Sequence, residues 1–214
     1  MTIKLHVFPL SPRAFKVMWC ATHLGIPYEI APVDFAKGTQ RTPEFTALNP
    51  NMRMPVLEDD GFTLWESNAI VQYLASRNPD ARLLPDEPQA RVSVTKWQFW
   101  DSAHWDPACA IFAFENYVKK LFGRGDPDEK EIARGNELMA RICPVLDGQL
   151  QKHRYVAGDA LTAADFSLGA MFWIAEQAKF PFEPYRGIQR WGADLQSLPS
   201  WLATAEAARA RMAG

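Results

Sequence analysis

Residues 49–67 read Asn-Pro-Asn-Met-Arg-Met-Pro-Val-Leu-Glu-Asp-Asp-Gly-Phe-Thr-Leu-Trp-Glu-Ser and carry a clear signal for local structure. Two short apolar runs, 55–58 and 62–65, lie on either side of Asp59-Asp60-Gly61. An Asp-Gly pair between two such runs is the strongest short-range signal for a β-hairpin, because both turn residues can adopt a positive φ. The stretch therefore predicts an antiparallel pair of strands.

The sequence around this hairpin extends it into a small α/β domain. Alternating apolar and polar residues and helical periodicity predict strands at 3–8 and 28–33 and helices at 12–24, 42–48 and 67–77. Pro12 suits the first position of its helix, and Asn78-Pro79 ends the last one. A right-handed crossover makes the first two strands parallel. The predicted order is βαβαββα.

After residue 88 the periodic segments are helical, which indicates a second, all-helical domain. We predict a first domain at 1–79, a linker at 80–88 held by Leu83 and Leu84 as a hydrophobic plug, and a helical domain at 89–214. Its helices are predicted at 89–122, with a bend at Pro107, and at 129–151, 162–178 and 198–212.

Composition excludes several classes of partner. The chain has 214 residues, 23 of them Lys or Arg and 25 Asp or Glu, so the formal net charge of -2 provides no attraction for nucleic acid or anionic lipid. The longest apolar stretch, 166–175, is about half of the ~20 residues that a membrane span needs. No export signal is visible, and three scattered cysteines (Cys20, Cys109 and Cys143) predict a cytoplasmic protein without a zinc site.

Ser11 lies at the junction of the first strand and the first helix. Its hydroxyl is expected beside unpaired amides and the positive end of the helix dipole, where an anion is favoured. A thiol there loses its proton more easily, and the serine hydroxyl can donate a hydrogen bond to the thiolate. A plain N-cap is the alternative role.

Further polar groups fall at a neighbouring loop and at the next strand-to-helix junction. If Pro55 is cis rather than trans, the backbone of Met54 is free to pair with an extended peptide. Glu66 can take an ammonium group and Ser67 a carboxylate, which together match the head of an α-amino acid. Either residue could instead be a plain helix cap.

Arg41 and Arg53 are loop cations that suit a second carboxylate or are simply solvated.

The four histidines are isolated, so neither a metal site nor a catalytic triad is predicted. Thr162-Ala163-Ala164-Asp165 is a capping box, which marks the start of a helix. Trp105 and Phe112 share an apolar helical stripe that belongs to the core or lines a cleft or a subunit contact.

The βαβαββα order, Ser11, Met54-Pro55, Glu66-Ser67 and the capping box together resemble the cytosolic glutathione transferases over essentially the whole chain. The position of Ser11 is similar to that of the serine in the serine-type members, such as the theta-, phi- and nu-like enzymes. The resemblance implies a thioredoxin-like N-terminal domain, an all-helical C-terminal domain and a homodimer.

The resemblance also implies roles for individual residues. Ser11 would activate the thiol of glutathione, Met54 and Pro55 would hold its cysteinyl part, and Glu66 and Ser67 would bind its γ-glutamyl end.

Two positions depart from the family pattern. Relatives often have glutamine where this chain has Arg53 and a basic pair where it has Gln40-Arg41, although arginine can still hold the glycyl carboxylate. Beta-type members carry a cysteine early in the first helix, whereas Cys20 lies about two turns beyond Ser11 and is interpreted as structural.

The implied activity is that of a detoxification enzyme that conjugates its co-substrate glutathione to a small hydrophobic electrophile without a metal. Leu10, Trp105 and Phe112 are predicted around the electrophile. One alternative is a glutathione-dependent disulfide reductase or peroxidase, because Ser11-Pro12-Arg13 resembles members of that kind. The other is a non-catalytic interaction module, which would have no affinity for glutathione.

Overall fold

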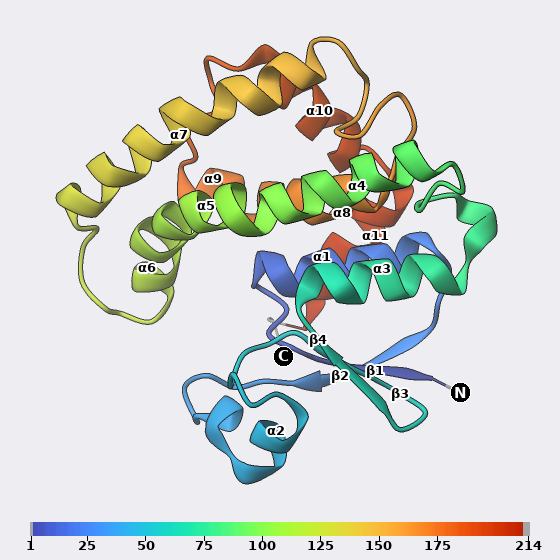
Figure 1. Ribbon diagram of the computed structural model, residues 1–214. Helices are drawn as coiled ribbons and strands as arrows, with labels where there is room; N and C mark the ends of the chain where they lie inside the picture. Colours follow the sequence, from blue (N-terminus) through green and yellow to red (C-terminus); the bar gives the residue numbers. More distant parts are fainter. Residues whose placement is uncertain (1, 212–214) are drawn as a thin grey trace. The chain divides into compact units, whose positions relative to one another are not determined.

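Residues 2–211 are described by the computed structural model, in which the chain separates into two units. One unit contains the residues up to Leu84 together with those from Leu198 onward, and the other contains Pro85–Ser197. Figure 1 follows the chain from its N-terminal strands to its C-terminal helices.

The first unit is built on a four-stranded sheet in the order β2-β1-β3-β4. Its strands are β1 (Ile3–Val7), β2 (Tyr28–Pro32), β3 (Val56–Asp59) and β4 (Phe62–Trp65). β1 is parallel to β2 and antiparallel to β3, and β3 pairs with β4 as the predicted hairpin. Asp60 and Gly61 form its turn with φ values of 50° and 82°, as an Asp-Gly turn requires.

Two helices, α1 (Pro12–His23) and α3 (Ser67–Arg77), lie on the same face of this sheet (Figure 1). Ile3, Leu5 and Val7 are buried on β1, while Lys4 between them is exposed, so the alternation selects one face for the core. A 3-10 turn, η1 (Thr39–Arg41), and the short helix α2 (Pro43–Leu48) lie between β2 and β3. The predicted βαβαββα order is confirmed.

The last helix, α11 (Pro199–Ala210), belongs to the first unit, although the sequence analysis grouped it with the helical domain at 89–214. Trp201 packs its ring 4.6 Å from that of Phe15 and 4.8 Å from that of Trp19 on α1. The indole of Trp19 also donates a hydrogen bond to Ser200 Oγ over 3.1 Å. These contacts between distant parts of the sequence decide where α11 packs. Met212, the predicted last residue of this helix, lies outside the described residues.

A short 3-10 turn, η2 (Pro79–Ala81), leads from α3 toward the second unit. Leu83 in this connection is buried, with 1% of its surface exposed, and Leu84 is half-buried.

The first helical stretch of the second unit runs from Pro88 to Leu121 and contains two π-helical segments. Its parts are α4 (Pro88–Trp100), η3 (Asp101–Trp105), α5 (Asp106–Phe112), η4 (Ala113–Val118) and α6 (Lys119–Leu121), of which η3 and η4 are the π segments. The sequence predicted a bend at Pro107, and η3 ends two residues before it. Pro107 has no N–H to donate and its ring crowds the preceding turn, which favours such an irregularity.

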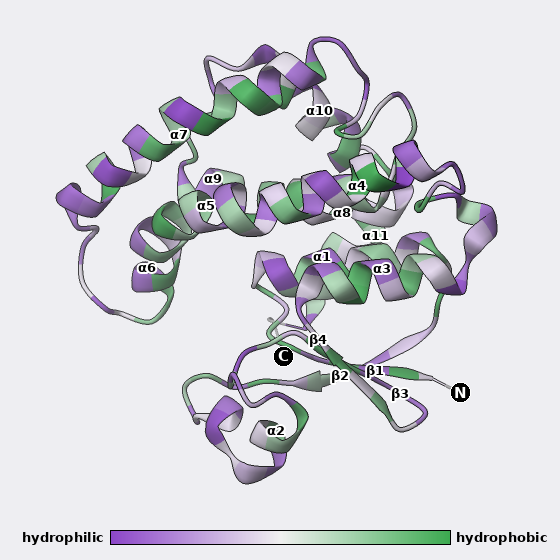
Figure 2. Cartoon of the chain, viewed as in Figure 1, coloured by the Kyte–Doolittle hydropathy of each residue, from purple (hydrophilic) through white to green (hydrophobic). Residues whose placement is uncertain are grey.

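The next helix, α7 (Glu129–Leu150), packs through an apolar stripe that includes Met139, Ile142, Leu146 and Leu150. Figure 2 shows hydrophobic and hydrophilic residues alternating along it. The helix predicted at 162–178 is interrupted, since it consists of α8 (Ala163–Gly169), a 3-10 segment η5 (Ala170–Ile174) and α9 (Ala175–Ala178).

The helix α10 (Arg186–Gln196) was not predicted from the sequence. Two glycines weaken its helical signal, but both permit close packing. A Cβ on Gly187 would lie 2.9 Å from the carbonyl oxygen of Asp147, and a Cβ on Gly192 would overlap the ring of Phe172. The Asp147 carboxylate accepts the N–H groups of Gly187 and Ile188 over 2.7 and 3.1 Å at the start of this helix.

Asp165 of the predicted capping box is completely buried and connects three segments. One carboxylate oxygen accepts the N–H of Val156 (2.9 Å) and the indole N–H of Trp191 (3.0 Å), and the other accepts the N–H (2.8 Å) and hydroxyl (3.1 Å) of Thr162. Burial raises the pKa of Asp165 to about 6 against the effect of these bonds. The residue is a structural hub of the second unit.

Candidate functional site

The register of the sheet brings the predicted polar residues of the first unit to one end. His6 on β1 pairs with Val56 on β3, and Val56 pairs with Trp65 on β4. The end of β1, the start of β3 and the end of β4 therefore lie together. We call this end of the sheet the site end. There Ser11 follows β1, Met54-Pro55 precedes β3, and Glu66-Ser67 follows β4.

Two helices of the first unit, α1 and α3, begin at this site end. α1 starts at Pro12 directly after β1, and α3 starts at Ser67 directly after β4. The unpaired N–H groups and positive dipole ends of two helices thus occur at the same end of the sheet. Such an environment favours negatively charged groups.

Ser11 is the N-cap residue of α1, but its side chain makes no capping hydrogen bond. Its backbone is used, because its N–H donates to the carbonyl of Phe8 and its carbonyl accepts the N–H of Phe15, each over 2.9 Å. The plain capping role considered for this hydroxyl is therefore not observed. The half-buried hydroxyl can donate to an anion instead.

The Met54-Pro55 peptide bond is cis. Asn49, which is buried, shapes the preceding loop by donating from Nδ2 to the carbonyl of Arg53 over 2.6 Å and accepting the N–H of Asn51 over 3.0 Å. Pro55 is buried and Met54 half-buried at the start of β3. The alternative of an ordinary trans proline is excluded.

Glu66 has an unusual backbone conformation for a residue with a side chain, with φ 72° and ψ 110°. Such conformations cost about 1–3 kcal/mol and cluster at functional sites. The side chain of Glu66 is exposed and makes no capping bond, and Ser67 at the first helical position is half-buried. The carboxylate thus remains accessible to a cation.

The sequence analysis missed a buried cation beside this junction. Lys16 on α1 is only 1% exposed, and its Nζ donates to Oδ1 of Asn68, the second residue of α3, over 2.8 Å. Helical lysines are usually solvated, so the sequence carried only a weak signal, namely that Lys16 lies between the apolar residues Phe15 and Val17.

Arg41 at the end of η1 and Arg53 in the loop before β3 are both exposed. Gln40 beside Arg41 buries its side-chain Oε1 without a hydrogen-bond partner in residues 2–211. These groups lie between β2 and β3 in the sequence.

The predicted electrophile residues have different environments. Leu10 is half-buried in the turn before α1. Trp105 is fully buried, stacks on Phe182 at 5.2 Å and donates from its indole to the carbonyl of Leu168 over 3.1 Å, and Phe112 is 2% exposed. These are contacts of core side chains, and an electrophile pocket around Trp105 and Phe112 stays a prediction.

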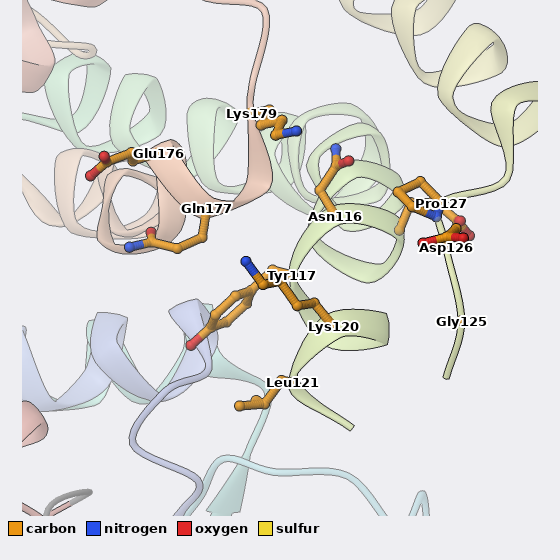
Figure 3. Close-up of a pocket in the computed structure, with 11 residues that line it drawn as sticks. Asn116, Tyr117, Lys120, Leu121, Gly125, Asp126, Pro127, Glu176, Gln177 and Lys179 are labelled. Atoms are coloured by element: carbon orange, nitrogen blue, oxygen red, sulfur yellow. The ribbon is translucent and has the colours of Figure 1, made fainter. Parts of the chain in front are cut away.

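The second unit has a pocket of about 890 Å³ of its own, lined from η4, α6 and α9 and from the loop before α7. Figure 3 shows Tyr117, Lys120 and Leu121 on one side and Glu176, Gln177 and Lys179 on the other. Partial burial raises the pKa of Tyr117, so its phenol stays protonated and can donate a hydrogen bond.

Within residues 2–211, no group of three or more His, Cys, Asp or Glu side chains is arranged to hold a metal ion. The same residues form no helix that is both long and apolar enough to span a membrane. All three cysteines are buried as free thiols. Burial raises the pKa values of Cys20 and Cys143.

Comparison with known proteins accounts for both units. Residues 1–76 match the family model of the glutathione S-transferase N-terminal domain, and residues 104–199 match that of the C-terminal domain. Glutathione S-transferase hmp2 of Hypomyces subiculosus is 32% identical over 213 residues, which are 97% of this chain and 100% of the relative. The chain belongs to the glutathione S-transferase family.

Solved structures of glutathione S-transferases have the same fold. A glutathione S-transferase from Pseudomonas fluorescens is 32% identical with a TM-score of 0.84, and the match covers 94% of this chain and 97% of that one. Glutathione transferase F7 from Populus trichocarpa is 28% identical with a TM-score of 0.88, covering 96% and 98% of the two chains. The expected thioredoxin-like and all-helical architecture of a cytosolic glutathione S-transferase is confirmed.

Proposed function

We propose that this chain is a glutathione transferase whose site end binds reduced glutathione and whose Ser11 hydroxyl stabilises the glutathione thiolate. The observation that carries the proposal is the register of β1, β3 and β4, which gathers an N-cap hydroxyl without a capping bond and two helix N-termini at one end of the sheet. A thiolate is stabilised in such surroundings.

The remaining site residues match the other parts of the tripeptide. Glu66 and Ser67 would hold the γ-glutamyl ammonium and carboxylate, and the Met54 backbone before cis Pro55 would pair with the cysteinyl residue. The exposed guanidinium groups of Arg41 and Arg53 suit the glycyl carboxylate.

In the proposed reaction the glutathione thiol releases its proton to solvent and the Ser11 O–H donates a hydrogen bond to the resulting thiolate. The sulfur attacks an electrophilic carbon, a C–S bond forms, and the leaving group departs with its electron pair. The chain's contribution is a lowered thiol pKa and the orientation of the sulfur, both of which reduce the barrier.

For the electrophile we propose a small, mainly hydrophobic molecule. What supports this class of substrate is the half-buried, apolar Leu10 directly before Ser11. The pocket of the second unit does not add support, because most of its lining residues are charged or polar.

The test is the rate of conjugation of glutathione to a model aryl halide by the native protein and by Ser11→Ala, with Ser197→Ala, a change in an exposed serine, as control. We expect Ser11→Ala to lose at least about tenfold in kcat and the control to retain full activity. Equal activity of Ser11→Ala and the native protein would overturn the role of Ser11. Activity on a mixed glutathione disulfide alone would favour a reductase.

We also propose a cytoplasmic homodimer. Val92 and Phe99 lie seven residues apart on α4 and are 66% and 72% exposed, an apolar pair that a second copy would cover. Light scattering after size exclusion should give twice the mass of the 24.2 kDa chain, and a monomer would contradict the proposal.

Buried free thiols are compatible with a reducing compartment, which cell fractionation can test.

A further inference from the structure

A small apolar cluster lies apart from the helices that cover the sheet, around the segment that joins β2 to β3. Val33, Phe45 and Val56 are its buried members, and Phe35, Leu48 and Met54 pack against them. We call residues 33–55 the α2 segment. It includes Arg41 and ends with Met54 and Pro55, so it carries a large part of the proposed glutathione contacts.

Phe45 is the only buried residue of α2 itself, with 4% of its surface exposed. Pro43, Glu44 and Ala47 are exposed. The helix has six residues and a single capping bond, from the Phe45 N–H to the Thr42 hydroxyl at 3.3 Å, so its intrinsic stability is low. Its position depends on what Phe45 packs against.

His6 of β1 provides part of that surface. Its ring lies 6.1 Å from the ring of Phe45 at an angle of 75°, which is an edge-to-face contact. The side chain is 15% exposed and points away from the main core, because His6 alternates with the buried Leu5 and Val7. Aromatic pairs of this geometry contribute beyond their buried area.

The His6 ring is also held by a residue of β3. His6 Nε2 lies 2.6 Å from Glu58 Oε1, and Lys4 Nζ is 3.7 Å from the same oxygen. The hydrogen bond with His6 is the main cause that lowers the pKa of Glu58. The Glu58 carboxylate therefore orients the ring that contacts Phe45.

We propose that His6, oriented by Glu58, is a positioning residue for glutathione binding, which supports Phe45 and so holds the α2 segment in place. The inference rests on the proposed function and adds two residues to it, neither of which is expected to touch glutathione. Ser11 lies outside the α2 segment. Loss of the support should therefore weaken the binding of glutathione and leave the reaction of the bound thiolate unchanged.

The test compares KM for glutathione with kcat at saturating glutathione in His6→Ala, His6→Phe and Glu58→Gln. We expect KM to rise about three- to tenfold in His6→Ala, the range of an aromatic pair, with kcat within about twofold. His6→Phe keeps an aromatic edge and should restore most of the affinity. The KM of Glu58→Gln should lie between those of His6→Ala and His6→Phe.

Lys4→Ala is the matched control, because Lys4 lies on the same face of the sheet and also contacts Glu58, whereas its side chain is half exposed. Its KM should equal that of the native protein. The proposal is overturned if His6→Ala leaves KM unchanged, if His6→Phe is as defective as His6→Ala, or if kcat falls in parallel with any rise in KM.

Hydrogen exchange without glutathione separates this proposal from the proposed function. In His6→Ala the amides of residues 36–54 should exchange faster than in the native protein, whereas those of α1 and α3 should not change. Unchanged exchange at 36–54 would refute the support role. A native protein that binds no glutathione would refute the proposed function, and the exchange result would still decide the role of His6.

Discussion

Replacement of Asp165 by asparagine tests the buried hub of the second unit. The two side chains have nearly the same shape, but the carboxylate accepts two hydrogen bonds at each oxygen, from Val156 N–H and the Trp191 indole at one and from the N–H and hydroxyl of Thr162 at the other. Asparagine offers an acceptor at one position only. Two donors then face an amide NH₂ and lose their partner.

Each unsatisfied buried donor costs about 1–3 kcal/mol, so Asp165→Asn should lower the free energy of unfolding by about 2–6 kcal/mol. For a chain of this length that corresponds to a fall in Tm of at least about 4 °C. The comparison is best made at about pH 8, because burial raises the pKa of Asp165 to about 6 and the carboxylate is then ionised.

The assay is thermal and urea unfolding followed by circular dichroism, with Asp86→Asn as control. Asp86 is exposed, and its replacement should change stability by no more than about 0.5 kcal/mol. A variant Asp165→Asn as stable as the native protein would show that the four hydrogen bonds do not support the second unit, and the reasoning would be wrong.

Three further outcomes are expected. Gly192→Ala places a Cβ against the Phe172 ring and should lower the free energy of unfolding in urea by about 1–3 kcal/mol. Gly148→Ala, in open space on α7, should leave the free energy of unfolding unchanged or raise it. The reverse order of stabilities would contradict the packing. Lys16→Met removes a buried cation beside Asn68 and should raise KM for glutathione about tenfold in steady-state assays, so an unchanged KM would remove it from the site. The three thiols should not react with a disulfide reagent in the native protein and should all react in guanidinium; a fast native reaction would contradict their burial.

Local sequence signals predicted most of the first unit. The Asp60-Gly61 turn, Pro12 at a helix start and Asn78-Pro79 after a helix act through neighbouring residues, and the corresponding elements appear where they were expected. The two-residue Asp60-Gly61 turn also fixes the register of β3 against β4. Whether Pro55 is cis depends on the surrounding fold, so the sequence left that alternative open.

What the sequence could not predict depends on contacts between distant residues. Trp201 packs on Phe15 and Trp19, which are distant from it in the sequence. The position of α11 in the sequence therefore did not show which unit it belongs to. α10 contains glycines, which disfavour a helix locally, and only packing against Asp147 and Phe172 explains them. In the site, burial of the Lys16 ammonium follows from the packing of the fold rather than from its neighbours in sequence.

Ser11 is proposed to lower the pKa of the thiol of bound glutathione. The most direct measurement is the ultraviolet absorbance of the thiolate of bound glutathione as a function of pH in the native protein and in Ser11→Ala; the protein's own thiols are buried and should not contribute. We predict a bound-thiol pKa about two units below that of free glutathione, returning toward the free value in Ser11→Ala. Bound glutathione with the same thiol pKa in both proteins would contradict the claim.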